Sequence, residues 1–225
     1  LKSMLLADAM ANVVKGKSWL GREVIKAPAL WIDFDNGKRR THERMEAIAR
    51  HLDLPEDAPF YYVSMPHPPL DAGNQDNIAE LQNRIESRGI KLLIIDNLKL
   101  ISPNQDENSD GMSKVMNNLR YLAENTGCAV VVIHHQRKSK GDGARAGESL
   151  RGHSSIEASL DLALLVSRDE GSEFVEIKST KTRDVDVYPF GAEYRYDHKE
   201  GGTELLTSCF VPSELEDNSP DNAIM

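Results

Sequence analysis

The chain opens with a residue pair that could bind phosphate. Lys2 and Ser3 stand at the start of residues 4–15, whose apolar spacing predicts a helix ending at Gly16. At a helix start, a lysine can reach the β- and γ-phosphate oxygens, and a serine hydroxyl can coordinate Mg²⁺. We expect this pair to be the second half of a phosphate-binding loop whose glycines lie upstream of Leu1. The pair carries little weight alone, because Lys-Ser occurs often by chance.

A second candidate is an aspartate that ends an apolar segment. The sequence KLLIIDN is a continuous apolar run closed by Asp96, which is typical of a strand buried on both faces. A carboxylate there could hold Mg²⁺ opposite the serine hydroxyl. The alternative is a turn or helix-capping aspartate.

A third candidate is the pair of aspartates in ALWIDFDNG. Asp33 and Asp35 alternate with apolar residues, so we expect both on one side of a strand, with Asp35 at its mouth. A carboxylate at that position could orient the water that attacks a γ-phosphate. The alternative is that DNG is simply a turn.

Two histidines end the apolar segment VVVIHH. Either His134 or His135 could sense a γ-phosphate and relay its presence to the next loop. A zinc site is the competing interpretation. It is weakened because adjacent residues of a strand face opposite ways and no Cys or His follows at ligand spacing. We expect one of the two histidines to be structural.

These candidates require a fold that brings strand ends together. Apolar strands alternate with helical segments over residues 1–135, which predicts right-handed βαβ units, a parallel sheet and a ligand site at its carboxyl edge. From about residue 160, short strands and tight turns predict an antiparallel extension of the sheet. The expected fold class is α/β, a mainly parallel sheet flanked by helices with antiparallel C-terminal strands. We expect one domain over residues 1–212 and an acidic flexible tail over 213–225.

Composition limits the class of protein. The net charge of −9 over 225 residues argues against a surface covered in nucleic-acid contacts, so any such contact needs a local basic patch. No apolar run approaches the roughly 20 residues that span a bilayer, and no signal peptide is evident, so we expect no membrane contact. Cys128 stands in an apolar run and is expected to be a buried free thiol, which favours a cytoplasmic location.

The order of these motifs resembles the RecA-like P-loop ATPases. Within them it is most similar to the RepA branch of hexameric replicative helicases, with further similarity to DnaB. Besides the motifs above, DENSDGMSKVMNNLRYLAENTG, LRGHSSIEASLDLALLVSRDE and KSTKTRD carry the resemblance, which covers roughly residues 1–190. It implies a RecA-like fold that binds ATP and Mg²⁺.

The resemblance also implies roles at the nucleotide. Lys2 and Ser3 match the phosphate-loop lysine and the Mg²⁺ ligand, and Asp96 matches the second carboxylate at the metal. Arg44 matches an arginine near the nucleotide.

Five residues match catalytic positions of the family. Asp35 stands where the family usually has a glutamate, and His135 is at the sensor position. Arg151 matches an arginine that follows the DNA loop, whereas Lys181 and Arg183 match a K-x-R pair that reaches the γ-phosphate of a neighbouring subunit. An arginine finger supplied by a neighbour raises turnover by about 10³- to 10⁵-fold. The alternative for KSTKTRD is a solvated hairpin.

The segment QRKSKGDGARAGES is the candidate contact to nucleic acid. Its basic residues are Arg137, Lys138, Lys140 and Arg145, with little apolar content and no aromatic side chain. In a ring, copies of this segment would surround single-stranded DNA and contact its phosphates without sequence preference. The alternative is an ordinary solvated loop.

The leading hypothesis is an ATPase that couples hydrolysis to movement along single-stranded DNA as a homo-oligomeric ring, expected to be hexameric. The alternatives are a RecA- or RadA-like recombination or regulatory ATPase, and a nucleotide-binding scaffold or loader without hydrolysis. The scaffold stays open because Asp35 is one methylene shorter than the family's glutamate.

Overall fold

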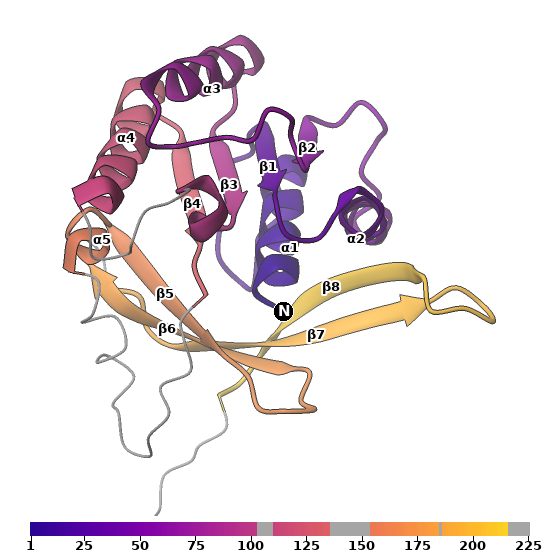
Figure 1. The fold of residues 1–225 in the computed structure, drawn as a ribbon. Coiled ribbons are helices and arrows are strands. Elements are labelled where there is room, and N and C mark those ends of the chain that lie inside the picture. Colours follow the sequence, from indigo (N-terminus) through magenta and orange to yellow (C-terminus); the bar gives the residue numbers. More distant parts are fainter. Residues whose placement is uncertain (103–109, 136–153, 185, 216–225) are drawn as a thin grey trace, which may run out of the picture.

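The computed structural model describes residues 1–102, 110–135, 154–184 and 186–215. They form two four-stranded sheets, one on each side of helix α1 (Lys2–Lys15) (Figure 1). The first sheet is parallel, with strand order β2-β1-β3-β4. Its strands are β1 (Ala29–Asp33), β2 (Phe60–Ser64), β3 (Leu92–Asp96) and β4 (Ala129–Ile133).

Helices connect these strands and cover both faces of the parallel sheet. They are α2 (Lys38–His51), α3 (Gln75–Arg88) and α4 (Asp110–Thr126), with a short 3-10 helix η1 (Leu98–Ile101) after β3. Side chains alternate along β1: Trp31 packs with α1 and α2, whereas Leu30 and Ile32 pack with α3 and α4. The predicted parallel α/β fold is therefore confirmed over this half of the chain.

The C-terminal strands form a sheet of their own. It has the order β5-β6-β7-β8 and is antiparallel throughout. Its elements are β5 (Leu162–Ser167), β6 (Phe174–Thr182), β7 (Phe190–His198) and β8 (Leu205–Ser213), preceded by the short helix α5 (Ser154–Ala158). The antiparallel strands were predicted correctly, but not as an extension of the first sheet. Apolar side chains on their inner face, such as Ile177, Tyr194 and Phe210, pack in the same core as α1, so the sheet covers this helix instead of lengthening the parallel sheet.

Helix α2 is fastened to the hairpin formed by β7 and β8. The Arg50 guanidinium donates hydrogen bonds to the carbonyl oxygens of Leu206 at 2.9 Å and Leu205 at 3.2 Å. The Glu43 carboxylate accepts a hydrogen bond from the Leu205 backbone N–H at 3.1 Å. The two sheets are thus joined through α2 as well as through α1.

Strand β4 is less buried than its apolar sequence predicts. It lies at one edge of the parallel sheet, and Ala129 is exposed while Val130, Val131 and Val132 are half-buried. Cys128, just before it, is buried and carries a free thiol, as predicted. Among the described helices, none combines the length and apolar character that a bilayer crossing requires.

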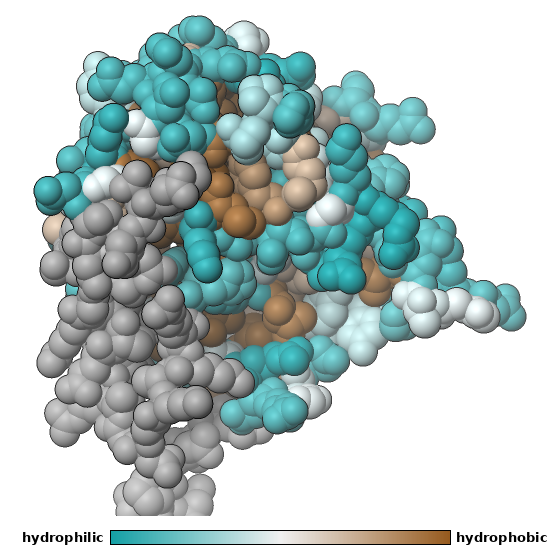
Figure 2. Space-filling model, in the orientation of Figure 1, coloured by the Kyte–Doolittle hydropathy of each residue, from teal (hydrophilic) through white to brown (hydrophobic). Residues whose placement is uncertain are grey.

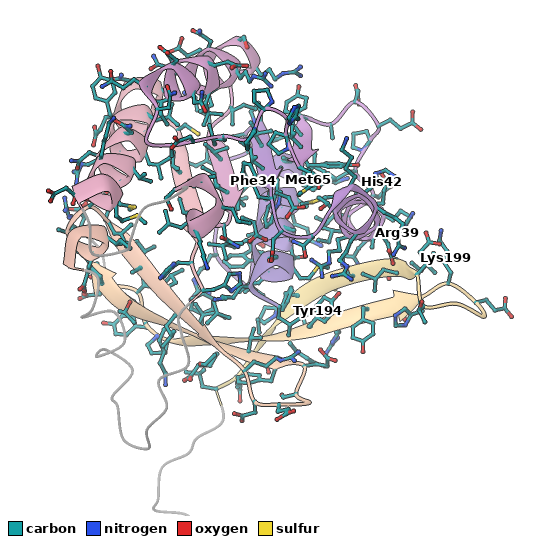
Figure 3. The ribbon with its side chains drawn as sticks, viewed as in Figure 1. Phe34, Arg39, His42, Met65, Tyr194 and Lys199 are labelled. Carbon is teal, nitrogen blue, oxygen red and sulfur yellow. The ribbon has the colours of Figure 1, made fainter. Side chains whose placement is uncertain are left out.

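One face of the molecule carries an apolar recess. Hydrophobic side chains gather between α3 and α2 and are surrounded by hydrophilic surface (Figure 2). Phe34, which directly follows β1, and Met65, which is 50% exposed after β2, lie on this face (Figure 3). The recess therefore adjoins the loop that carries Asp35.

Candidate functional site

The first turn of α1 meets the carboxyl ends of β3 and β4. The Ser3 hydroxyl donates a 2.7 Å hydrogen bond to Oδ2 of Asp96, a residue 93 positions away in sequence. The Lys2 ammonium donates to the His134 carbonyl oxygen at 2.9 Å. Figure 1 shows α1 beginning at the end of the molecule where these strands finish. The structure thus brings Lys2, Ser3 and Asp96 together, as their positions at a helix start and a strand end lead one to expect.

Asp96 has one carboxylate oxygen that remains unpaired. The residue is fully buried, and Oδ1 has no hydrogen-bond partner among the described residues. Burial raises the pKa of Asp96 above its ordinary value, and the neighbouring carboxylates of Asp33 and Asp35 raise it further. The hydrogen bond from Ser3 and the charge of His135 oppose this rise. A buried, unpaired carboxylate oxygen beside a serine hydroxyl fits a bound cation, which would satisfy the oxygen and neutralise the charge.

Two further side chains lie close to Asp96. One carboxylate oxygen each of Asp35 and Asp96 and a ring nitrogen of His135 all lie within 4.8 Å of one another, with Asp35 and His135 exposed. Sheet register explains this meeting, because Asp33, Asp96 and Ile133 are aligned across β1, β3 and β4. Residues that follow these three positions therefore emerge at one edge.

Asp33 does not share the environment of Asp35. Its Oδ1 accepts hydrogen bonds from the backbone N–H groups of Asp35 and Asn36 and from the Asn36 amide, and its Oδ2 accepts from the hydroxyls of Thr41 and Ser64. Although burial opposes it, this set of donors holds the pKa of Asp33 below its ordinary value. With both oxygens occupied, Asp33 shapes the loop after β1 and is not available as a base.

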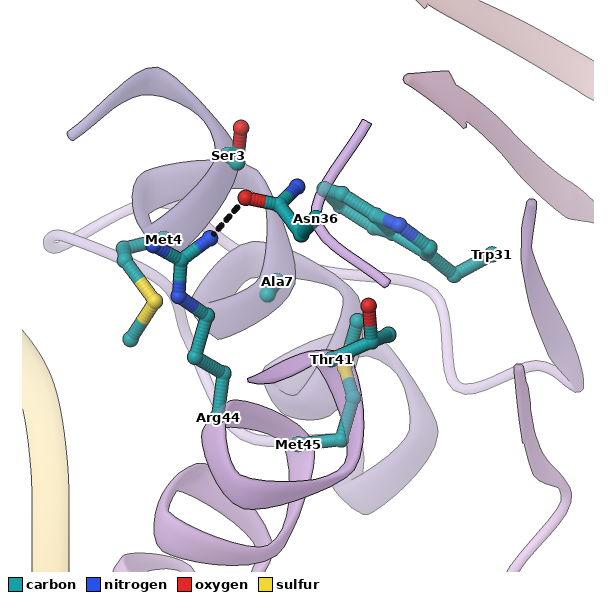
Figure 4. Close-up of a pocket in the computed structure, with 8 residues that line it drawn as sticks. All are labelled: Ser3, Met4, Ala7, Trp31, Asn36, Thr41, Arg44 and Met45. Carbon is teal, nitrogen blue, oxygen red and sulfur yellow. Dashed lines mark hydrogen bonds between the residues drawn. The ribbon is translucent and has the colours of Figure 1, made fainter. Parts of the chain in front are cut away.

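Arg44 faces the first turn of α1 across a small pocket. Its guanidinium donates a 2.7 Å hydrogen bond to the Asn36 side-chain oxygen, and Ser3 and Met4 line the same pocket (Figure 4). Asn36 was missed in the sequence, where it was interpreted only as part of a turn. Its contact with Arg44 depends on side-chain geometry, which the sequence does not display.

Comparison with known proteins places this geometry in a family. A family model described as an AAA domain, AAA_25, matches residues 1–141, which is more than half of the chain. The chain belongs to the AAA domain family.

Two solved structures show the fold that this AAA domain adopts. The ATPase domain of a helicase is 14% identical, with a TM-score of 0.55 over 75% of this chain and 71% of that chain. The RadB recombinase is 12% identical, with a TM-score of 0.58 over 85% of this chain and 81% of that one. These likenesses confirm the predicted RecA-like P-loop ATPase fold.

The AAA domain holds its K-x-R pair away from the first turn of α1. The Lys181 ammonium donates to the Glu157 carbonyl oxygen, and the Arg183 guanidinium donates to the Ala158 carbonyl oxygen at 2.5 Å. Arg183 also pairs with the Asp161 carboxylate at 3.4 Å. This end of β6 lies beside α5, apart from the start of α1 (Figure 1). Within one chain the structure therefore does not bring the pair to the site.

The remaining candidates lie outside the described residues of the AAA domain. They are Arg151 and the basic residues Arg137, Lys138, Lys140 and Arg145. Their roles stay predictions from sequence.

Proposed function

We propose that this AAA domain is a Mg²⁺-dependent ATPase that couples ATP hydrolysis to movement along single-stranded DNA as a hexameric ring. The observation that carries the proposal is the contact between the Ser3 hydroxyl and the Asp96 carboxylate at the start of α1. A phosphate-binding helix start and a metal-binding strand end meet there in the manner that phosphoryl transfer requires.

Four residues bind the nucleotide in this proposal. Lys2 and the N-terminus of α1 attract the phosphates, because the helix dipole and the ammonium both favour negative charge. Burial lowers the pKa of Lys2, while Asp96 counteracts that change. Ser3 and Asp96 hold Mg²⁺, which neutralises charge on the phosphate oxygens when bound. Arg44, fixed by Asn36, faces the phosphates from α2.

Two residues act on hydrolysis. Asp35 is exposed and beside Asp96, so its carboxylate can orient a water molecule against the phosphate. His135 lies at the same point and directly precedes the basic segment. A change at His135 on hydrolysis therefore passes to the residues that contact DNA.

Assembly into a ring explains two further features. Each chain has a net charge of −9, so a strand of DNA is attracted only where copies of the basic segment gather. Lys181 and Arg183 lie away from their own chain's site, which supports a role at the site of a neighbouring subunit.

The nucleotide site is tested by titrating the full protein with Mg²⁺ and a fluorescent ATP analogue. Lys2→Ala and Asp96→Asn should each weaken binding at least about tenfold, because a charge-assisted contact to phosphate or metal is lost. Lys17→Ala is the matched control, since Lys17 is exposed on the loop after α1. Unchanged affinity in both site variants would refute the proposed site.

The DNA role is tested by measuring ATP turnover and binding with single-stranded DNA. Turnover should rise with DNA, and replacing Lys138 and Lys140 by Ala should weaken DNA binding and flatten its dependence on salt. Nucleotide binding without turnover would favour the scaffold instead. Turnover without unwinding of a forked duplex would favour a recombinase-like ATPase, the alternative that the likeness to RadB supports.

A further inference from the structure

Three side chains from separate loops converge on one point at the carboxyl edge of the parallel sheet. Asp35 follows β1, Asp96 ends β3 and His135 follows β4. One possible ligand atom from each lies within 4.8 Å of the other two. This spacing allows a single ion to contact all three.

An independent observation indicates that the point is built for a positive ligand. Asp96 is fully buried, yet its Oδ1 has no hydrogen-bond partner in the described part of the chain. Leaving a buried carboxylate oxygen unpaired costs stability. A cation at the centre of the three side chains would satisfy it, while Oδ2 stays bound to Ser3.

The types of ligand decide which cation fits. Carboxylates suit Mg²⁺, but imidazole favours borderline ions such as Zn²⁺. Three protein ligands of nitrogen and oxygen type with a remaining open position are the usual set for Zn²⁺ exposed to solvent. Asp35 and His135 are exposed, which gives an ion a path of entry.

We propose that the nucleotide-free protein binds one borderline divalent cation, represented by Zn²⁺, through Asp35, Asp96 and His135. This ion is distinct from the Mg²⁺ that accompanies the nucleotide. The sequence argument against zinc considered only Cys and His at ligand spacing, whereas two of these ligands are carboxylates from other strands. The proposal requires only the three side chains and does not depend on nucleotide binding.

Bound Zn²⁺ would occupy groups that the proposed ATPase needs. Asp96 cannot turn the same oxygen to a second metal, and Asp35 and His135 would be withdrawn from the nucleotide. Zn²⁺ and Mg²⁺-nucleotide should therefore compete for one site, and Zn²⁺ would act as an inhibitor at this strand edge.

The proposal is tested by calorimetric titration of the full, nucleotide-free protein with Zn²⁺ alone. One ion should bind per chain, and His135→Ala and Asp35→Asn should each weaken binding at least about tenfold, because one of three protein ligands is lost. The controls are His198→Ala, at the end of β7 on the other sheet, and Asp57→Asn, on an exposed turn. Co²⁺ in place of Zn²⁺ should give a visible absorption band that His135→Ala removes.

The outcomes separate this proposal from the ATPase proposal. Absence of stoichiometric Zn²⁺ binding, or equal affinity in wild type and His135→Ala, would overturn the metal site even if the protein binds Mg²⁺-nucleotide normally. Zn²⁺ binding that depends on His135 would support it even if no nucleotide bound. Competition between Zn²⁺ and the fluorescent nucleotide would additionally place both ligands at one strand edge.

Discussion

Asp8 is a buried acid on α1 whose charge opposes folding. It is 1% exposed, and its Oδ2 accepts a 2.9 Å hydrogen bond from the Trp19 indole N–H. Burial raises the pKa of Asp8 to about 6, although hydrogen bonds from Trp19 and the Phe210 backbone oppose the rise. The folded protein thus retains this proton up to about pH 6, whereas an unfolded aspartate loses it near pH 4.

The pKa of Asp8 predicts a pH-dependent contribution to stability. Unfolding releases this proton between about pH 4 and pH 6, so the contribution falls as pH rises through that window. Asp8→Asn removes the titration. The difference in unfolding free energy between wild type and variant should therefore change by about 3 kcal/mol from about pH 4 to about pH 7. Urea denaturation at several pH values measures it.

The difference between proteins isolates Asp8 from other titrating groups. Asp186→Asn, on an exposed position, should leave the wild-type pH profile unchanged. A difference that stays constant across this pH range would show that the carboxyl group titrates normally.

Residue positions at the candidate site were partly predictable from the sequence. Ser3 and Asp96 could be paired because a helix start and a strand end in a parallel sheet share one edge. The separate fates of Asp33 and Asp35 could not be predicted, because they depend on Thr41 and Ser64 reaching one carboxylate. Such contacts are set by side-chain geometry between elements far apart in sequence.

Gly191 in β7 allows the antiparallel strands to approach closely. A Cβ at this position would lie 2.6 Å from Cε2 of Phe174 and 2.7 Å from the Ser213 carbonyl oxygen. Both distances are too short for real contacts, and Ser213 offers a backbone atom that cannot rotate away. The strand order β6-β7-β8 therefore requires a residue without a side chain here.

Gly191→Ala should lower the free energy of unfolding by about 1–3 kcal/mol, because the strands must separate to admit the methyl group. Gly202→Ala is the matched control, since the nearest atom to its Cβ would be 3.8 Å away. Urea denaturation of both variants provides the comparison. Equal stability of Gly191→Ala and wild type would mean that the strands move apart without cost.

Secondary-structure elements were predicted more fully than their arrangement. The helices and strands of residues 1–135 follow apolar periodicity, so α1 to α4 and β1 to β4 were all expected. The short η1 and α5 were missed, because four or five residues are too few to show a helical period. The separate second sheet was missed because strand pairing between distant segments depends on what covers α1.

Arg183 tests the behaviour of the assembled protein. Within its own chain it binds the end of α5 and Asp161, so a catalytic role requires a neighbouring subunit. Arg183→Ala should reduce ATP turnover by about 10³-fold or more while leaving nucleotide affinity unchanged. Turnover and fluorescent nucleotide binding measure the two effects. Arg195→Ala, another exposed arginine on a strand, is the control.

Mixed assemblies reveal which subunit uses Arg183. Lys2→Ala subunits retain Arg183, and Arg183→Ala subunits retain Lys2, so mixing the two inactive variants should restore part of the turnover. A mixture that stays inactive would place Arg183 at its own chain's site or in the folding of that chain.

Helix α1 has a consequence for the molecule as a whole. Its first turn carries Lys2 and Ser3, and its middle, including Met10 and Ala11, is fully buried between the two sheets. Close-packed contacts of this kind transmit displacement because they cannot be compressed. Tension at the first turn is therefore felt by the β7–β8 hairpin without any intervening hinge, which makes the helix a rigid strut between the chemical and the mechanical ends of the domain.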